Sequence, residues 1–129
     1  MQLLLAAVLA VASSVALAGD LRVVLINGAG TDITVETKTT EAVIELLPGE
    51  TKVVSPRQLQ WLRFGQESYR YNVVSIKQRA AQHPGVLVLQ AHADGSLYVL
   101  PSGTAKAQTK LPPQPRGFPV KPTKKVDLT

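Results

Sequence analysis

Short apolar runs separated by turn-forming residues occupy most of the chain. Several runs alternate apolar and polar side chains, which is the period of a half-buried β-strand. Turn signals recur about every 8–12 residues, the spacing typical of small sandwiches and barrels. The pattern predicts an all-β domain: a small antiparallel β-sandwich of about seven strands, with immunoglobulin-like topology as the leading arrangement. The runs that we expect to form strands are residues 21–26, 33–38, 42–47, 51–55, 58–64, 68–76, 86–91 and 97–100.

Two dipeptides predict specific turns. Pro48-Gly49 fits a type II turn, because proline fixes φ at the first central position and glycine accepts a positive φ at the second. Asp94-Gly95 predicts a hairpin between the last two runs, with Asp94 as the first central residue. Between these turns, residues 77–83 contain helix formers and are expected to form one or two helical turns that end at Pro84-Gly85.

The first 18 residues have the pattern of a secretory signal sequence. Residues 3–11 are all apolar, and Ala16-Leu17-Ala18 supplies the small-x-small pattern of a cleavage site. No Lys or Arg precedes the apolar stretch, so an uncleaved anchor is the alternative; no later segment is apolar for long enough to span a bilayer. The chain has no cysteine, which excludes disulfides. We expect a periplasmic or secreted protein in which residues 1–18 are the signal peptide and residues 19–105 form the sandwich domain.

Residues 106–129 differ in composition from the rest of the chain. They hold six Lys/Arg and one Asp, a balance equal to the formal net charge of +5 of the whole chain. They also hold five of the nine prolines, which lack the N–H donor needed for helix and sheet pairing. The composition predicts a disordered, Pro-rich tail that serves as a basic arm for an anionic partner or as a solubilising spacer. Its candidate binding residues are Lys106, Lys110, Arg116, Lys121, Lys124 and Lys125.

The aromatic-rich pair of strands carries a candidate binding face. If residues 65–68 form its loop, Arg63 lies opposite Arg70, and Trp61 lies on the same side of the pair. Directly opposed arginines are destabilising without an anion between them, and Trp and Arg are enriched at binding hot spots. We expect Trp61, Arg63 and Arg70 to bind an acidic group of a partner, unless a nearby glutamate neutralises the pair or the register slips by one residue. The core-facing side would hold Leu62, Phe64, Tyr69 and Tyr71.

The sequence favours a protein that is not an enzyme. There is no cysteine, no G-x-S-x-G or S-x-x-K sequence, and neither His83 nor His92 has an evident serine and carboxylate context. His92 and Asp94 form the best metal-ligand pair, but a surface histidine beside a turn aspartate explains them better. The glutamates between residues 36 and 50 resemble a solvated sheet face rather than a catalytic pair. No metal site and no cofactor is therefore predicted.

Together these features predict an exported, non-enzymatic interaction module of the cell envelope: an assembly accessory, a subunit or an inhibitor. It would bind a protein partner through the sandwich face or through an edge strand at residues 21–26, with the basic tail as a second contact. One alternative is a binder of an anionic polymer or membrane surface that acts through the tail, and another is a small hydrolase. Nucleic acid is a weaker candidate, because export removes most of it and the tail has only Phe118 as a stacking aromatic residue.

Overall fold

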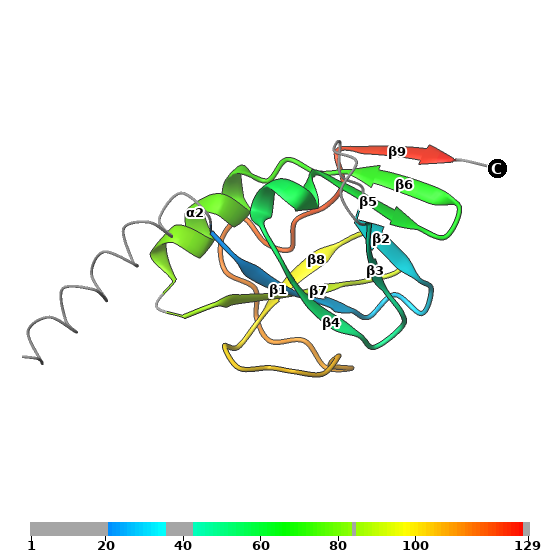
Figure 1. The fold of residues 1–129 in the computed structure, drawn as a ribbon. Coiled ribbons are helices and arrows are strands. Elements are labelled where there is room, and N and C mark those ends of the chain that lie inside the picture. The colour runs from blue at the N-terminus through cyan, green and yellow to red at the C-terminus, as the bar shows by residue number, and fades with distance from the viewer. Residues whose placement is uncertain (1–20, 36–42, 84, 128–129) are drawn as a thin grey trace, which may run out of the picture.

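The computed structural model describes residues 21–35, 43–83 and 85–127. In these residues the chain forms two facing β-sheets, with a short α-helix near one end of the pair (Figure 1). The predicted signal peptide, residues 1–18, lies outside the described residues. The prediction of a β-rich, sandwich-like fold is confirmed.

The two sheets differ in strand direction. The four-stranded sheet contains, in spatial order, β4 (Thr51–Val54), β1 (Val23–Asn27), β7 (Leu87–Ala91) and β8 (Leu97–Leu100). The five-stranded sheet contains β3 (Ile44–Leu46), β2 (Ile33–Val35), β5 (Trp61–Phe64), β6 (Glu67–Arg70) and β9 (Lys124–Asp127). A 3₁₀-helix, η1 (Pro56–Gln60), and the α-helix α2 (Val74–Gln82) lie between β4 and β7 in the chain.

Two features of these sheets correct the sequence prediction. β1 and β7 are parallel, so the four-stranded sheet is mixed, whereas every pair in the other sheet is antiparallel. The described residues form nine strands rather than about seven. β1 also lies between β4 and β7, so the run at residues 21–26 is an interior strand and not an edge open to a partner.

The main core lies between the sheets, because side chains alternate along each strand. Val23 and Leu25 of β1 point to the same side as Leu87 and Leu89 of β7, and all four are fully buried. Ile76 of α2 is buried in the same cluster. A second, smaller cluster on the far side of the four-stranded sheet contains Ile26, Val88 and Leu100, with Val24 and Leu111 partly buried against it.

Residues 58–60, which the sequence predicts as strand, belong to η1. Ser55 and Gln58 cap this helix reciprocally: Gln58 Oε1 accepts from the Ser55 N–H (2.8 Å), and Ser55 Oγ accepts from the Gln58 N–H (3.4 Å). Pro56 follows the cap at the first helical position, where its missing N–H costs nothing. The strand therefore begins only at Trp61.

The helix expected over residues 77–83 is present but begins earlier, at Val74. Asn72 Oδ1 accepts from the Val74 N–H (3.0 Å) and satisfies one of the free donors of the first turn. Residues 74–76 are thus helical rather than the end of a strand. Short apolar runs fit either element, so the sequence pattern alone does not distinguish them.

The predicted Pro48-Gly49 turn is present. The Glu50 N–H donates to Leu47 O (2.9 Å), and Gly49 has a φ of +84°, as a type II turn requires.

The last hairpin is also present, with its turn shifted by one residue. The Gly95 N–H donates to His92 O (2.8 Å), so the central residues are Ala93 and Asp94, and Asp94 is the second of them rather than the first. Gly95 follows with a φ of +86°, which is the arrangement of a type I turn followed by a bulge.

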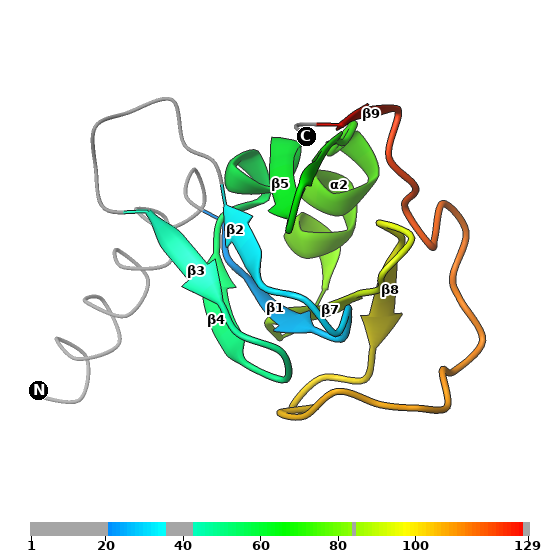
Figure 2. The same ribbon diagram turned by 90° about the vertical axis from the view of Figure 1, so that its right-hand side faces the viewer.

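The Pro-rich segment is where the structure differs most from the sequence prediction. Residues 106–127 are not a disordered tail: they lie against the sandwich and end in β9, which pairs with β6 (Figure 2). Proline lacks a donor, but the residues between the prolines supply one. Leu97 and Val120, for example, exchange two backbone hydrogen bonds of 2.8 and 2.9 Å. Residues 101–123, between β8 and β9, are called the strap.

The strap and β9 close one side of the sandwich. Val120 bonds the outer edge of β8, and so does the side chain of Gln114, which accepts from the Val99 N–H (2.8 Å) and donates to Val99 O (3.0 Å). β9 covers the outer edge of β6. The outermost strands on the opposite side are β3 and β4 (Figure 2).

Candidate functional site

The β5–β6 hairpin positions the candidate binding face. Its loop is two residues long, Gly65 and Gln66, where the sequence predicts four, and Gly65 has a φ of +60°. Glycine at the first central position fits a type II′ turn, whose twist matches that of the flanking strands. The register therefore differs from the predicted one by two residues, which changes partners but not faces. The prediction that Arg63 faces Arg70 is wrong, because Arg63 pairs with Ser68 and Arg70 pairs with Trp61.

The inner side of the hairpin is part of the aromatic core. The Tyr71 hydroxyl donates to Gly95 O (2.6 Å), and the Tyr69 hydroxyl donates to Glu67 Oε2 (2.6 Å). Burial, aided by the hydrogen bond to Glu67, raises the pKa of Tyr69 from 10.0 to about 12, and burial also raises the pKa of Tyr71. The side chains predicted for this side are all buried: Leu62, Phe64, Tyr69 and Tyr71.

The outer side of the sheet gathers aromatic and basic side chains. The guanidinium carbon of Arg70 lies 5.6 Å from the ring centroid of Trp61, a cation–π contact. Lys124 of β9 is the partner of Arg70 on its other side, so the three residues form one row across β5, β6 and β9. Arg63 is exposed on the same side of β5, and its Nε donates to Gly65 O (3.1 Å). We call Trp61, Arg63, Arg70 and Lys124 the basic face.

Within the described residues, no carboxylate forms an ion pair with the basic face. The one ion pair in residues 21–35, 43–83 and 85–127 joins Lys125 Nζ to Glu67 Oε2 (2.9 Å) at the edge of the sheet. Glu45 of β3 shares the outer side but is separated from Arg63 by β2. Arg63, Arg70 and Lys124 are all exposed. Their charges, next to a planar indole, suit an oxyanion such as a carboxylate, which guanidinium groups bind with two hydrogen bonds.

The other basic residues predicted to bind a partner are dispersed. Lys106 and Lys110 lie on the strap beside Leu100 of the four-stranded sheet, whereas the basic face is on the five-stranded sheet. Arg116 and Lys121 are exposed further along the strap, and Lys125 is paired with Glu67. Of the six cations of the Pro-rich segment, Lys124 is the one that the structure brings beside Trp61, Arg63 and Arg70.

Two residues that the sequence analysis did not single out complete the row of Arg63. Thr34 of β2 and Ser68 of β6 are its cross-strand partners. The sequence signal that locates Ser68 is the glycine at position 65, which favours a two-residue turn and so fixes the register. Nothing local in the sequence locates Lys124, because its position depends on the path of the strap.

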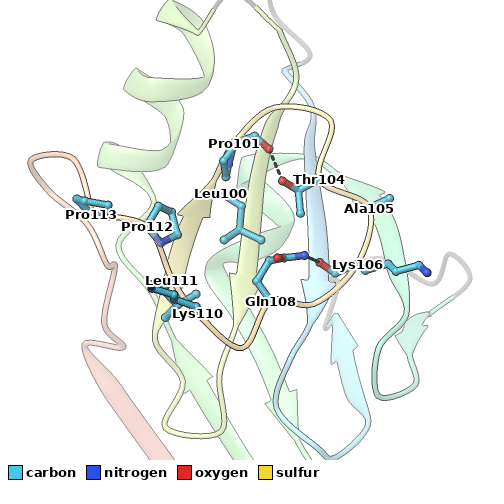
Figure 3. Close-up of a pocket in the computed structure, with 10 residues that line it drawn as sticks. All are labelled: Leu100, Pro101, Thr104, Ala105, Lys106, Gln108, Lys110, Leu111, Pro112 and Pro113. Carbon is cyan, nitrogen blue, oxygen red and sulfur yellow. Dashed lines mark hydrogen bonds between the residues drawn. The ribbon is translucent and has the colours of Figure 1, made fainter.

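The strap also borders an open hollow on the outer side of the four-stranded sheet (Figure 3). Its volume is about 690 Å³. The Thr104 hydroxyl donates to Pro101 O (2.6 Å) and shapes its rim, and the Lys106 side chain points away from it. The hollow is therefore mainly apolar. Its lining residues are Leu100, Pro101, Thr104, Ala105, Lys106, Gln108, Lys110, Leu111, Pro112 and Pro113.

His83 lies at the end of α2 and contacts backbone groups. Its Nδ1 is 3.2 Å from both the N–H and the carbonyl of Gly85, and its Nε2 is 3.5 Å from Ser102 Oγ. A serine nucleophile needs a histidine that is oriented by a third group, usually a carboxylate. Here the third position is taken by the backbone of Gly85, so the pair resembles a helix-end contact rather than a catalytic dyad.

His92 and Asp94 are held by the β7–β8 turn. The His92 ring packs edge-on against Tyr98, with 4.6 Å between ring centroids. Asp94 Oδ1 accepts from the Ser96 N–H (2.9 Å), and this hydrogen bond holds the pKa of the carboxyl below its usual 3.8. The described ranges contain no group of three or more His, Cys, Asp or Glu side chains that could hold a metal ion.

Comparison of the chain with protein-family models, curated proteins and solved structures finds no significant match. In the part of the chain that the structure describes, no helix is both long enough and apolar enough to cross a membrane.

Proposed function

We propose that the protein is an exported, non-enzymatic interaction module of the cell envelope that binds an acidic surface of a protein partner through the basic face. The observation that carries this proposal is the row of Trp61, Arg70 and Lys124, which has no ion pair among the described residues. The finer proposal of an immunoglobulin-like sandwich, a class found in many cell-surface domains, fits the two facing sheets, but the parallel pair of β1 and β7 departs from that class.

The basic face suits the carboxylates of a folded surface. Arg63 and Arg70 each offer a planar fork of donors that matches a carboxylate, and Trp61 offers apolar area that a partner would remove from water. All three lie on neighbouring strands of one sheet, so little backbone conformational entropy is lost on binding. Lys124 provides the contact of the C-terminal segment, whereas Lys106 and Lys110 would stay outside this interface.

The fluorescence of Trp61 tests the proposal directly, because it is the only tryptophan of the chain. Poly-L-glutamate serves as the probe for a carboxylate-rich protein surface, a sulfated polysaccharide for an anionic polymer, and vesicles with anionic phospholipid for a membrane. We expect polyglutamate to change the emission of Trp61, and Arg70→Ala to weaken its binding about tenfold, the size expected for a central arginine contact.

A matched control distinguishes the basic face from general positive charge. Arg63→Ala/Arg70→Ala and Lys106→Ala/Lys110→Ala each remove two cations, the first pair from the five-stranded sheet and the second from the strap. The proposal requires the first pair to abolish polyglutamate binding and the second to leave it nearly unchanged. Equal losses in the two double variants, or binding only to the polysaccharide or the vesicles, would favour the anionic-surface alternative and contradict the proposal.

A further inference from the structure

The two sides of the sandwich are protected unequally. The strap and β9 bond the outer edges of β8 and β6. On the other side, β4 is the outermost strand of the four-stranded sheet (Figure 2). Exposed sheet edges template pairing with other chains, and proteins normally blunt or cover them. Among the described residues, the strap bonds β4 only through the Thr51 hydroxyl, which donates to Ala105 O (3.1 Å), so the backbone edge of β4 stays available for recognition.

The register with β1 identifies which groups of β4 are free. Val23 pairs with Val54 and Leu25 with Lys52, and the Asn27 N–H donates to Glu50 O (2.9 Å), so the backbone groups of residues 50, 52 and 54 face β1. Those of Thr51 and Val53 face outward. In the described ranges, neither the N–H nor the carbonyl of these two residues has a hydrogen-bond partner. Ser55, the next outward residue, is already bonded to Gln58.

The side chains at this edge alternate in chemistry. Val53, on the outer side of the sheet beside Val24, is 54% exposed. Lys52, on the inner side, is also exposed. Beyond the end of β4 lies a hollow of about 300 Å³ lined by both Arg22 and Arg57, and none of its described lining residues carries a carboxylate. The edge thus presents an exposed apolar position at Val53 and a basic position at Lys52, with two arginines beyond them. The next residue on the side of Lys52 is Glu50, whose Oε1 accepts from the Leu47 N–H (2.7 Å).

We propose that the β4 edge binds an extended segment of another protein, in which apolar side chains alternate with acidic ones. The segment would add a strand to the four-stranded sheet by bonding the outward groups of Thr51 and Val53. A carboxylate opposite Lys52 would neutralise it, an apolar side chain would cover Val53, and a further carboxylate would reach Arg22 or Arg57. This inference is independent of the basic face, which lies on the other sheet.

The inner position of Lys52 argues against a second copy of the same strand as the occupant. Antiparallel self-pairing centred on residue 52 would place two lysines directly opposite each other, and like charges there are destabilising. An inward-pointing charge on an edge strand is also a known device against edge-to-edge aggregation. The same charge admits a strand that brings a carboxylate, so Lys52 selects the occupant by charge.

Amide hydrogen exchange measured by NMR tests the proposal. The probe is a short, capped peptide of alternating valine and glutamate, and the control peptide has lysine in place of glutamate. We expect the valine–glutamate peptide to slow exchange at Thr51 and Val53 by about tenfold or more, because strand addition protects outward amides. The amides of Lys52 and Val54, which face β1, serve as internal controls and should change little.

Two variants make the outcome decisive. Val53→Pro removes an outward N–H, which an edge strand tolerates, so the fold should persist while protection is lost. Lys52→Glu should reverse the preference, so that the lysine peptide protects Thr51 and Val53 instead. Absent protection, equal protection by both peptides, or a peptide-free dimer that Val53→Pro dissociates would each overturn the proposal. Arg63→Ala/Arg70→Ala should leave peptide binding intact, so this test and the test of the basic face fail independently.

Discussion

The side-chain amide of Gln90 forms hydrogen bonds with both the N–H and the carbonyl of Gln108. Gln90 Nε2 donates to Gln108 O (2.9 Å), and Gln90 Oε1 accepts from the Gln108 N–H (2.7 Å). Gln90 is only 1% exposed, on the outer side of β7. This buried side chain, whose Nε2 also lies 2.9 Å from His92 Nε2, therefore serves as an anchor of the strap on the four-stranded sheet. It explains how a segment so poor in backbone donors is fixed there.

Replacing Gln90 by leucine should destabilise the fold. Gln90→Leu keeps the volume but leaves the N–H and carbonyl of Gln108 without partners, for which we expect a loss of about 2 kcal/mol in the free energy of unfolding. Urea denaturation monitored by circular dichroism measures it. Gln108→Ala is the matched control: it keeps the backbone groups that Gln90 binds and removes only a surface contact to Lys106 O, so its cost should be within about 0.5 kcal/mol. Equal costs in the two variants would contradict the role of the amide pair.

The sequence predicted best those features that local chemistry decides. The strands near residues 23–27 and 51–54 and the Pro48-Gly49 turn follow from alternation and from the φ preferences of proline and glycine. The separation of Trp61 and Arg70 from the core also follows from alternation, and it survives the error in loop length because the register differs by an even number of residues.

The C-terminal segment was mispredicted because its structure depends on distant partners. Five prolines favour an unpaired chain, and no local pattern shows that Val120 will meet Leu97 or that Lys124 will meet Arg70. The segment is ordered by its hydrogen bonds to the outer edges of β8 and β6 and by the side-chain amides of Gln90 and Gln114. Such long-range pairing is a property of the fold, which a single sequence does not report.

Removal of the strap and β9 should therefore destabilise the sandwich rather than release an idle tail. Truncation of the chain after Ala105 would expose the edges of β8 and β6 and would remove Val120 from the core. We expect a lower urea midpoint and concentration-dependent association, seen by size-exclusion chromatography with light scattering. Gln114→Ala removes three hydrogen bonds and should cost about 2 kcal/mol on its own.

A double variant that removes positive charge from the strap without shortening the chain is the control for that truncation. Arg116→Ala/Lys121→Ala removes two exposed cations of the strap but none of the hydrogen bonds that hold the strap on the sheets, so stability and monomeric state should be retained. A truncated protein as stable and monomeric as the full chain would show that the strap is dispensable for the fold.

Alanine substitutions at Gly49 and Gly95 distinguish the cost of backbone strain from the cost of a steric clash. Both have a φ near +85°, at +84° and +86°, so alanine at either position carries the strain of a left-handed conformation, about 1 kcal/mol. A Cβ at Gly49 would meet nothing within 4 Å, whereas a Cβ at Gly95 would lie 3.0 Å from Pro122 Cγ and 3.2 Å from the Tyr69 ring. Gly95→Ala should therefore cost about 2 kcal/mol more than Gly49→Ala in urea denaturation.

Pro122 belongs to the strap, so the same comparison reports on its packing. In the double variant Gly95→Ala/Pro122→Ala the closest of the two contacts is relieved, and part of the extra cost should be recovered in a double-mutant cycle. Equal costs for alanine at positions 49 and 95 would mean that Pro122 does not pack against the β7–β8 turn.

The buried tyrosines should make the fold sensitive to alkaline pH. Burial raises the pKa of Tyr69 to about 12 and that of Tyr71 also above its ordinary value of 10.0, so both phenols ionise more readily in the unfolded chain. A raised folded-state pKa gives stability that is fully present below pH 10 and is lost as the pH rises from there through the folded-state value. The free energy of unfolding should thus fall between pH 10 and about 12, with a slope of up to about 1.4 kcal/mol per pH unit for each tyrosine.

Urea denaturation at a series of pH values measures this slope. Tyr71→Phe loses the hydrogen bond to Gly95 O, which should lower the free energy of unfolding by about 1 kcal/mol at neutral pH. The same variant should also remove the contribution of Tyr71 to the slope above pH 10. Tyr69→Phe/Tyr71→Phe should remove the contributions of both tyrosines. A slope unchanged in the double variant would assign the alkaline sensitivity to other groups and contradict the assignment to these two phenols.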